Sequence, residues 1–430
     1  MCSRFDSGFL FIARWFKLMT CKESIEYLES LAGFGIRPGL QRITKLFEIL
    51  GQPQKKYKTI HVTGTNGKGS VCAMLAQILK TANIKTGLFT SPHLVSYRER
   101  FKINDIDISE DDFANLVDEL KVCITSLLDE GYESPTLFET LTAIAFKYFA
   151  DNDVEYAVIE VGLGGLLDST NVITPEVSVI TNVANDHAEK CGGDLLGIAR
   201  YKAGIIKPNV PVVTGTSGEP LEIIRETAQK NHSKIFMLGE DFFIDESLEL
   251  SLQGEYQKFN AAIAIKAAQL LNNDDINDSM IIDAIKNTHW AGRFECFNIK
   301  CKQVIIDGAH NGAGAKALRE SLDKKFPTGQ RIFLFGVLKD KDIDVIIENL
   351  FRPQDFVIVT RPDSERAAEP EDIVQHLKSR GIEAIAIDDN AEAFDKFINS
   401  DSKILIAAGS LYLIGHVREL LNNLNQQATF

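Results

Sequence analysis

The chain contains few cysteines, and none forms a recognisable metal-binding or redox pair. Seven cysteines are scattered over 430 residues without a C-x-x-C pair. Cys296 and Cys301 lie closest together, but their spacing matches no common zinc knuckle. An odd number of scattered cysteines is typical of reduced thiols, so we expect a cytoplasmic protein without a disulfide framework.

Positive charge and long apolar runs are also scarce. Lys and Arg number 46 against 60 Asp and Glu, which gives a formal net charge of −14. Nucleic-acid binding generally needs a cationic surface, so this balance argues against it, and anionic ligands must be held by local groups of Lys and Arg. No uncharged apolar run is long enough to span a bilayer. Arg14 interrupts the apolar stretch at 9–16 and no small-residue cleavage site follows, so we expect neither a membrane span nor a signal peptide.

The most informative stretch is a glycine-rich loop between a predicted strand and a predicted helix. The strand is expected at residues 59–62, the helix at 71–80, and between them lies Thr63-Gly64-Thr65-Asn66-Gly67-Lys68-Gly69-Ser70. Glycines let backbone N–H groups approach phosphates, and the helix N-terminus adds positive potential. Lys68 would reach the terminal phosphates, and Ser70 offers a hydroxyl to phosphate or Mg²⁺. Gly69 departs from the usual G-x-x-x-x-G-K-[ST] spacing because it separates the lysine from the serine. A glycine-rich loop can also be a simple tight turn, but the strand before this loop and the helix after it favour nucleotide binding.

Predicted strands and helices alternate along the chain from residue 58 onward. Further strands are expected at 86–90, 156–161, 177–181 and 210–214, and a second series at 303–306, 332–336, 356–360, 384–387 and 404–408. Helices are expected at 112–128, 137–149, 259–271, 280–287, 314–326, 343–350, 371–379, 390–398 and 412–424. Apolar strands alternating with helices predict an α/β fold with mostly parallel sheets. We expect a weakly ordered extension at 1–20, a large domain at 21–294 and a smaller α/β domain at 295–430.

Polar motifs follow several predicted strands at their carboxyl ends, where open α/β sheets bind ligands. They are Thr90-Ser91-Pro92-His93-Leu94, Glu160-Val161-Gly162-Leu163-Gly164-Gly165, Asn185-Asp186-His187 and the segment 201–208. A carboxylate at Glu160 suits a Mg²⁺ ion held between protein and phosphates. Taken singly, His187 can cap a helix, Glu160 can pair with a lysine, and Ser91-Pro92 can be a turn. Together, beside a phosphate loop, they favour one ligand site.

These motifs resemble those of the folylpolyglutamate synthase/dihydrofolate synthase family of the Mur ligase superfamily. The resemblance runs from about residue 24 to 420 and includes Asp168-Ser169-Thr170-Asn171 and the segment 202–207. In the second half it rests on Gln257 with Asn260, Trp290 with Gly292-Arg293, Asp307-Gly308-Ala309-His310-Asn311, Lys339-Asp340-Lys341-Asp342 and Gly409-Ser410-Leu411-Tyr412-Leu413. The strings at 307–311 and 409–413 separate this family from other phosphate-loop proteins.

The resemblance implies an ATP-dependent amide ligase built from a P-loop-type Mur ligase ATPase domain and a smaller Rossmann-like domain. Such an enzyme adds L-glutamate to dihydropteroate, or to the γ-carboxylate of tetrahydrofolate and its polyglutamates, through an acyl phosphate. ATP and Mg²⁺ are the implied cofactors. The expected partners are these small molecules alone, with no nucleic acid or membrane, and the expected state is a monomer whose two domains close over the nucleotide.

Site roles carry over residue by residue from the resemblance. The ATP phosphates are assigned to Gly64, Thr65, Asn66, Gly67, Lys68, Gly69 and Ser70, and further nucleotide contacts to Asn260, Arg293 and Asp307. The first Mg²⁺ is assigned to Ser91, Glu160 and His187; the loop alone would have suggested Ser70, and we favour Ser91. Lys202 matches a lysine that can carry a carbamate, which would hold a second Mg²⁺. Glutamate is assigned to His310 and Ser410, the folate to Ser91, Pro92, His93, Arg98 and Arg100, and catalytic roles to Lys68, Lys202, Asp307 and His310.

Several alternatives stay open at this point. Arg98-Glu99-Arg100 can be merely a solvated charge run. Leu166, Tyr201, Ala291 and Gly312 depart from the commonest family strings, but none of them is a predicted metal or phosphate ligand. The enzyme can be a folylpolyglutamate synthase alone, a Mur-type ligase with another carboxylate substrate, or a catalytically silent nucleotide-binding relative.

Overall fold

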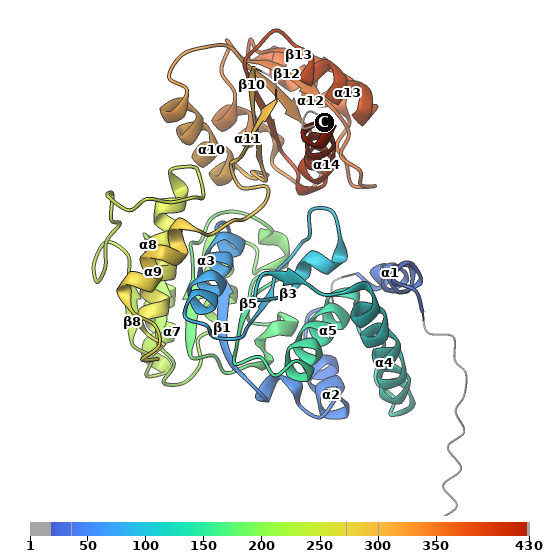
Figure 1. The fold of residues 1–430 in the computed structure, drawn as a ribbon, viewed down its shortest axis with the longest axis vertical. Helices are drawn as coiled ribbons and strands as arrows, with labels where there is room; N and C mark the ends of the chain where they lie inside the picture. The colour runs from blue at the N-terminus through green and yellow to red at the C-terminus, as the bar shows by residue number, and fades with distance from the viewer. Residues whose placement is uncertain (1–18, 36, 272, 300, 428–430) are drawn as a thin grey trace, which may run out of the picture.

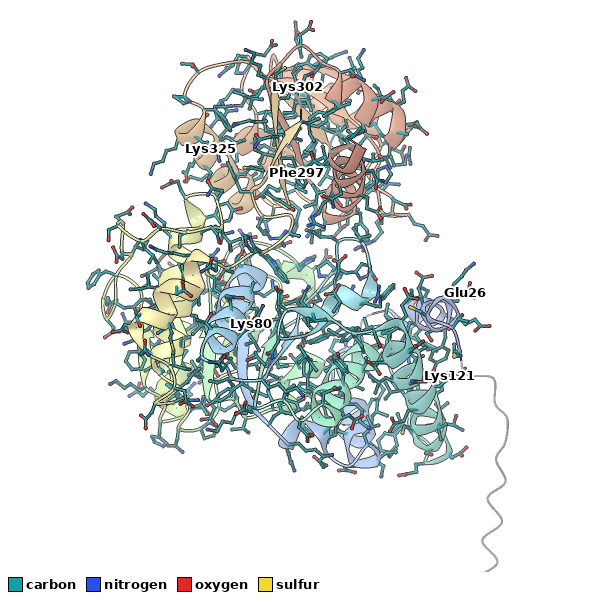
Figure 2. The ribbon with its side chains drawn as sticks, viewed as in Figure 1. Glu26, Lys80, Lys121, Phe297, Lys302 and Lys325 are labelled. Carbon is teal, nitrogen blue, oxygen red and sulfur yellow. The ribbon has the colours of Figure 1, made fainter. Side chains whose placement is uncertain are left out.

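The computed structural model of the chain describes residues 19–427, apart from residues 36, 272 and 300. Two α/β units are stacked along the long axis of the molecule, and the C-terminal unit is the smaller one (Figure 1). Side chains from both units reach into the space between them (Figure 2). Within the described residues, no helix combines the length and apolar character needed to cross a bilayer.

The first unit is built on an eight-stranded sheet in its described part, with the order β4-β3-β2-β5-β1-β6-β7-β8. Its parallel strands are β1 (Lys58–Thr63), β2 (Thr86–Phe89), β5 (Tyr156–Glu160), β6 (Val177–Ile180), β7 (Val212–Thr214) and β8 (Ile235–Met237). The antiparallel strands β3 (Phe101–Ile103) and β4 (Ile106–Asp107) form a hairpin at one edge. Central β1 pairs Val62 with Glu160 and Thr63 with Ile180, so the loops after β1, β5 and β6 leave the sheet side by side.

Helices bury both faces of this sheet because successive strand residues point to opposite sides. One face packs against α3 (Lys68–Thr81), α8 (Tyr256–Gln269) and α9 (Asp278–Lys286). The other packs against α1 (Cys21–Ser30), α2 (Gln41–Ile49), α4 (Glu110–Asp129) and α5 (Leu137–Asp151), and further along against α6 (Leu195–Ala203) and α7 (Glu219–Lys230). In β5, Val158 belongs to the first core and Ile159 to the second.

The second unit has a six-stranded sheet in its described part, with the order β13-β12-β11-β14-β10-β9. Its strands are β9 (Glu295–Ile299), β10 (Lys302–Asp307), β11 (Arg331–Phe335), β12 (Phe356–Val359), β13 (Glu383–Ala386) and β14 (Ile404–Ala408). All pair in parallel except β9 with β10. One face is covered by α10 (Gly312–Lys325), α11 (Ile343–Leu350) and α12 (Pro370–Ser379), the other by α13 (Asn390–Ile398) and α14 (Leu411–Gln427).

The expected α/β architecture with mostly parallel sheets is confirmed, but the sequence missed four short strands. The missed strands are β3, β4, β8 and β9; three of them are two or three residues long and offer too little periodicity to recognise. The second sheet begins at Glu295, the residue at which the second domain was predicted to start. Residues 1–18 of the predicted extension lie outside the described residues.

Candidate active site

A cavity of about 500 Å³ lies where the carboxyl ends of the two sheets face each other. Its lining contains most of the predicted site residues: Gly64, Thr65, Asn66, Gly67, Lys68, Gly69, Ser70, Ser91, Pro92, Glu160, His187, Lys202, Asn260, Arg293, Asp307, His310 and Ser410. His93, Arg98 and Arg100 are not part of the lining. The motifs at separate strand ends are therefore brought together at one site, as expected for the carboxyl edges of parallel sheets.

The phosphate loop joins β1 to α3 in a conformation that only glycine allows at two points. Gly67, the N-cap of α3, has φ +83°, and a Cβ there would lie 2.3 Å from Asn260 Oδ1. A Cβ on Gly64 would lie 1.8 Å from Thr181 Oγ1. Thr181 also donates its hydroxyl to Asn66 O at 2.6 Å, and Lys68 Nζ donates to Gly64 O at 3.0 Å. The loop is thus held in a fixed shape at the N-terminus of a helix, where anions bind favourably.

The Ser70 hydroxyl faces helix α8. It is buried and accepts a hydrogen bond from Gln257 Nε2 at 3.2 Å. Gln257 Oε1 in turn accepts from Asn260 Nδ2 at 2.9 Å. This chain of contacts ties the first turn of α3 to the predicted nucleotide contact Asn260.

Glu160 places a buried carboxylate at the end of β5, next to the phosphate loop. Its Oε2 accepts a hydrogen bond from the backbone N–H of Ser91 at 2.9 Å. Burial raises the pKa of Glu160, and the positive charges of Lys68, Arg293 and Arg100 oppose that rise. Among the described residues, no group of three or more His, Cys, Asp or Glu side chains is arranged to hold a metal ion. The oxygens of Ser91 and Glu160 suit Mg²⁺, which is commonly bound by one or two carboxylates together with nucleotide phosphates and water.

Asp186, which the sequence analysis left without a role, joins the two units across the cavity. Its carboxylate accepts from Lys341 Nζ at 2.8 Å and from Asn311 Nδ2 at 3.0 Å, both of which belong to the second unit. Burial alone would raise the pKa of Asp186, but the nearby imidazole of His310 and the charge of Lys341 outweigh it and hold the pKa well below its usual value. Asp186 is therefore ionised and pairs with a cation across the interface.

His187, a predicted Mg²⁺ ligand, lines the same cavity but faces a cation. Its Nε2 lies 3.1 Å from Lys341 Nζ, and burial lowers its pKa. The imidazole is therefore neutral, as a metal ligand must be. In this arrangement Nε2 meets the lysine, so metal ligation through that nitrogen requires Lys341 to move. The metal role of His187 stays a prediction.

The phosphate loop also contacts the second unit directly. Asn66 and Asn311 exchange two side-chain hydrogen bonds, at 3.2 and 3.1 Å. Asn311 is the N-cap of α10, where its Oδ1 accepts from Gly314 N at 2.8 Å. The N-terminus of α10 therefore points toward the loop that is expected to hold the ATP phosphates.

The Asp186–Lys341 pair predicts a measurable role in joining the two units. Both side chains are about nine-tenths buried, with exposures of 11% and 7%. Replacing Lys341 with Met should raise the KM for glutamate, the substrate that the second unit is predicted to bind, about tenfold, which corresponds to about 1.4 kcal/mol. The effect should be no larger, because Asn311 still donates to Asp186. The matched control is Lys339→Met, since Lys339 is half-exposed and pairs with Glu369 at the surface. Steady-state kinetics of both variants provide the test, and equal KM values would contradict the role.

Lys202 is a buried lysine on α6 that lines the cavity. Asp186, whose charge acts on Lys202, pairs with Lys341 instead. Burial, together with the nearby charge of Lys68, lowers the pKa of Lys202 to about 7. A substantial fraction of the amine is therefore neutral at neutral pH. A neutral amine is nucleophilic and can add CO₂, the reaction that the predicted carbamate requires.

Asp307 is fully engaged by protein donors. Its carboxylate accepts from the hydroxyl of Tyr256 at 2.5 Å and from the backbone N–H groups of Phe294 and Ala309, each at 2.8 Å. Burial raises its pKa, and the hydrogen bond from Tyr256 opposes the rise. These contacts show that Asp307 fixes the junction between the two units; its predicted nucleotide contact and catalytic role remain predictions.

The two residues predicted to receive glutamate lie at neighbouring strand ends of the second sheet. Asp307 pairs with Ala408 in the β10–β14 register, which brings the loops that carry His310 and Ser410 together. His310 Nδ1 lies 2.7 Å from Gly308 O, so Nδ1 carries the proton, and Nε2 lies 3.7 Å from Asp186. Ser410 is buried, and its hydroxyl accepts from Tyr412 N at 3.2 Å.

The three predicted folate residues outside the lining make contacts within their own segment. Arg98 donates to Ile108 O at 3.1 Å and pairs with Glu110 at 3.6 Å. Arg100 donates through Nε to His93 Nδ1 at 2.8 Å. Burial, with the nearby charge of Arg100, lowers the pKa of His93 to about 3, so the ring is neutral and accepts. Arg98 is thus occupied away from the cavity, whereas Arg100 is close enough to act on the pKa of Glu160.

Comparisons with known proteins match both units. Residues 62–245 match the model of the Mur ligase middle domain, and residues 292–411 that of the Mur ligase glutamate ligase domain. The dihydrofolate synthase/folylpolyglutamate synthase of Bacillus subtilis is 34% identical, over 90% of this chain and 96% of that protein. The Mycobacterium tuberculosis folylpolyglutamate synthase complexed with ADP and AMPPCP has a TM-score of 0.86 at 30% identity, covering 93% and 99%. E. coli FolC in complex with DHPP and ADP has a TM-score of 0.85 at 28% identity, covering 94% and 98%.

Proposed function

Because this chain belongs to the dihydrofolate synthase/folylpolyglutamate synthase family of Mur ligases, we propose that it adds L-glutamate to dihydropteroate and to the γ-carboxylate of tetrahydrofolate and its polyglutamates. It is an ATP-dependent ligase of folate metabolism. The observation that carries the proposal is the shared cavity: a phosphate loop with a buried carboxylate on one wall, and the strand ends of the glutamate ligase domain on the other.

The reaction has two steps. In the first, a carboxylate oxygen of the pterin acid attacks the terminal phosphorus of ATP, the bond to the bridging oxygen breaks, and ADP leaves. In the second, the neutral amine of glutamate attacks the carbonyl carbon, the C–O bond to phosphate breaks, and the nitrogen gives up a proton to the departing phosphate or to water as the amide forms. The first step brings two anions together, so Lys68 and the backbone N–H groups of its loop stabilise the charge that develops on the phosphate oxygens.

Mg²⁺ fits this site at Ser91 and Glu160, with His187 as a third ligand once Lys341 has moved. Bound there, the ion would neutralise phosphate charge and polarise the phosphoryl oxygens. A carbamate on Lys202 would offer carboxylate oxygens to a second ion, in place of an ammonium group that repels it. The same buried environment that lowers the pKa of Lys202 supports this modification.

Substrate positioning accounts for the two-domain architecture. Holding both reactants across one cavity replaces an encounter in solution, an effect that in favourable cases supplies about 7–11 kcal/mol of the barrier. We propose that His310 and Ser410 orient glutamate from the second unit, while Arg100 and the segment after Ser91 orient the folate. The six cysteines at described positions are free thiols, which supports a cytoplasmic enzyme. Each chain completes its own cavity from its two units, which supports a monomer.

The substrate requirement provides the direct test. Release of ADP and phosphate should need ATP, glutamate and a pterin acid together, because phosphate leaves the acyl phosphate only when an amine attacks it. The assay compares dihydropteroate with tetrahydrofolate as acceptor and omits one component at a time. ATP turnover that continues at the same rate when glutamate or the acceptor is omitted would contradict the proposal. Failure to complement a folate-ligase-deficient strain would favour a catalytically silent relative, and turnover with another carboxylate would favour a different Mur-type ligase.

A further inference from the structure

The loop at residues 91–96 contacts both units of the enzyme. At its start, Ser91 donates its backbone N–H to the buried carboxylate of Glu160 in the cavity. Three residues later, Leu94 packs into the apolar core that the second sheet forms with α13 and α14. A single short segment therefore connects a predicted metal and substrate site of the first unit with the interior of the second.

Two glycines make room for this contact. A Cβ on Gly415, in α14, would lie 2.2 Å from Leu94 O and 3.0 Å from its carbonyl carbon. A Cβ on Gly292 would lie 3.0 Å from Leu94 Cδ1 and 2.9 Å from Ile414 Cδ1. The 2.2 Å approach is to a backbone atom, which cannot rotate away as the end of a side chain can. Leu94 therefore reaches α14 only because residue 415 has no side chain.

Glu99 makes the loop rigid. Its carboxylate accepts three backbone N–H groups, from Leu94 at 2.8 Å, Val95 at 3.0 Å and Ser96 at 2.9 Å. Glu99 also completes a capping box with Ser96 at the start of a short helical turn. On the Ser91 side, Arg100 donates through Nε to His93 Nδ1, so the residue before Leu94 is held as well, and a displacement of Leu94 moves an anchored part of this short segment. The charge run at 98–100 is not simply solvated, because Glu99 builds this loop.

We propose that Leu94, Glu99 and Gly415 are positioning residues that couple the docking of the second unit to the placement of Ser91 beside Glu160. When Leu94 is seated against Gly415, Ser91 is held at the phosphate-loop side of the cavity. When the units separate, the loop is released and Ser91 loses its fixed position. The coupling rests on the proposed function only where its effect is measured as turnover.

The Gly415→Ala variant separates this role from an ordinary structural one. Alanine normally stabilises a helix relative to glycine, so a purely structural effect would leave or raise the melting temperature and preserve activity. The coupling also predicts a melting temperature no lower than that of the parent, so the two readings differ in activity and shape. We expect kcat/KM for glutamate to fall about tenfold or more, and the X-ray scattering profile in the presence of AMPPCP to be more extended. Gly33→Ala is the matched control, because a Cβ there meets nothing within 4 Å.

Leu94 supplies the second measurement if the Gly415 variant fails to fold. Leu94→Ala should lower kcat/KM, and Leu94→Met, which keeps a side chain of similar volume, should restore most of it. The Leu94→Ala/Gly415→Ala double variant should lose no more than the worse single variant, because both act on one contact. Parental activity in Gly415→Ala, or losses that multiply in the double variant, would overturn the coupling. A parent enzyme without glutamate-dependent turnover would refute the proposed function, while the scattering comparison would still decide the coupling.

Discussion

Replacing Lys202 with Ala should lower kcat/KM by about 10²–10³-fold, the loss typical of removing one preorganised group that stabilises charge. The variant loses the only amine on α6 that lines the cavity in the described structure. If the lysine acts as a carbamate, short carboxylic acids such as acetate should restore part of the activity by supplying the missing carboxylate. The matched control is Lys230→Ala, because Lys230 is exposed at the end of α7. Near-parental activity of Lys202→Ala without added acid would contradict the role.

The carbamate itself should depend on pH in a defined direction. CO₂ adds only to the neutral amine, and the pKa of Lys202 is about 7, so the neutral fraction is small at pH 6 and large at pH 8. A carbamate signal in ¹³C NMR with labelled bicarbonate should therefore grow from pH 6 to pH 8 and be absent in Lys202→Ala.

The lowered pKa of Lys202 also affects the stability of the protein. Above about pH 7 the unfolded chain binds the proton more strongly than the folded one, so unmodified Lys202 makes stability rise with pH toward its unfolded pKa. The alanine variant should lack that contribution.

The sequence predicted the first wall of the cavity because parallel strands align their carboxyl ends. Val62 and Glu160 are neighbours in the β1–β5 register although they are far apart in the chain, and the rule that ligands bind at this edge needs only the strands to be recognised. The β-branched residues of β1 and the apolar run of β5 made that possible. His310 and Ser410 were assigned to glutamate from the family resemblance alone, and the structure supplies the reason that they lie together, since β10 and β14 are adjacent.

The contacts between the two units were beyond sequence reasoning. Asp186 and Lys341 are 155 positions apart, and Asn66 and Asn311 are 245 apart, so no local spacing relates them. Each lay within a motif of the family resemblance, but a motif does not show which partner a side chain meets. Glu99 was missed for a different reason. A charged residue between two arginines is typical of an exposed surface. Only the backbone turn at Leu94–Ser96 shows that the Glu99 carboxylate accepts three hydrogen bonds.

Glu160→Gln should separate the function of this carboxylate from its effect on stability. The amide keeps the shape of the side chain and an oxygen that can accept from Ser91 N. It removes the negative charge that we propose holds Mg²⁺, so turnover should fall about 10²–10³-fold, the scale of one charge-stabilising group. Binding of Mn²⁺ in the presence of AMPPCP, followed by electron paramagnetic resonance, should weaken in parallel and reports on the site without turnover.

The stability of the Glu160→Gln variant should be equal to or higher than that of the parent at neutral pH. Burial raises the pKa of Glu160, so the folded protein binds its proton more strongly than the unfolded chain does. Stability therefore falls as pH rises from the unfolded to the folded pKa, and the ionised carboxylate is a cost above that window. Glutamine avoids this cost, as expected where a strained group is kept for activity. Glu176→Gln is the control, because Glu176 is exposed and directly precedes β6, at the amino ends of the parallel strands. A lower melting temperature in Glu160→Gln with Mn²⁺ binding unchanged would show that the carboxylate serves the fold and not the metal.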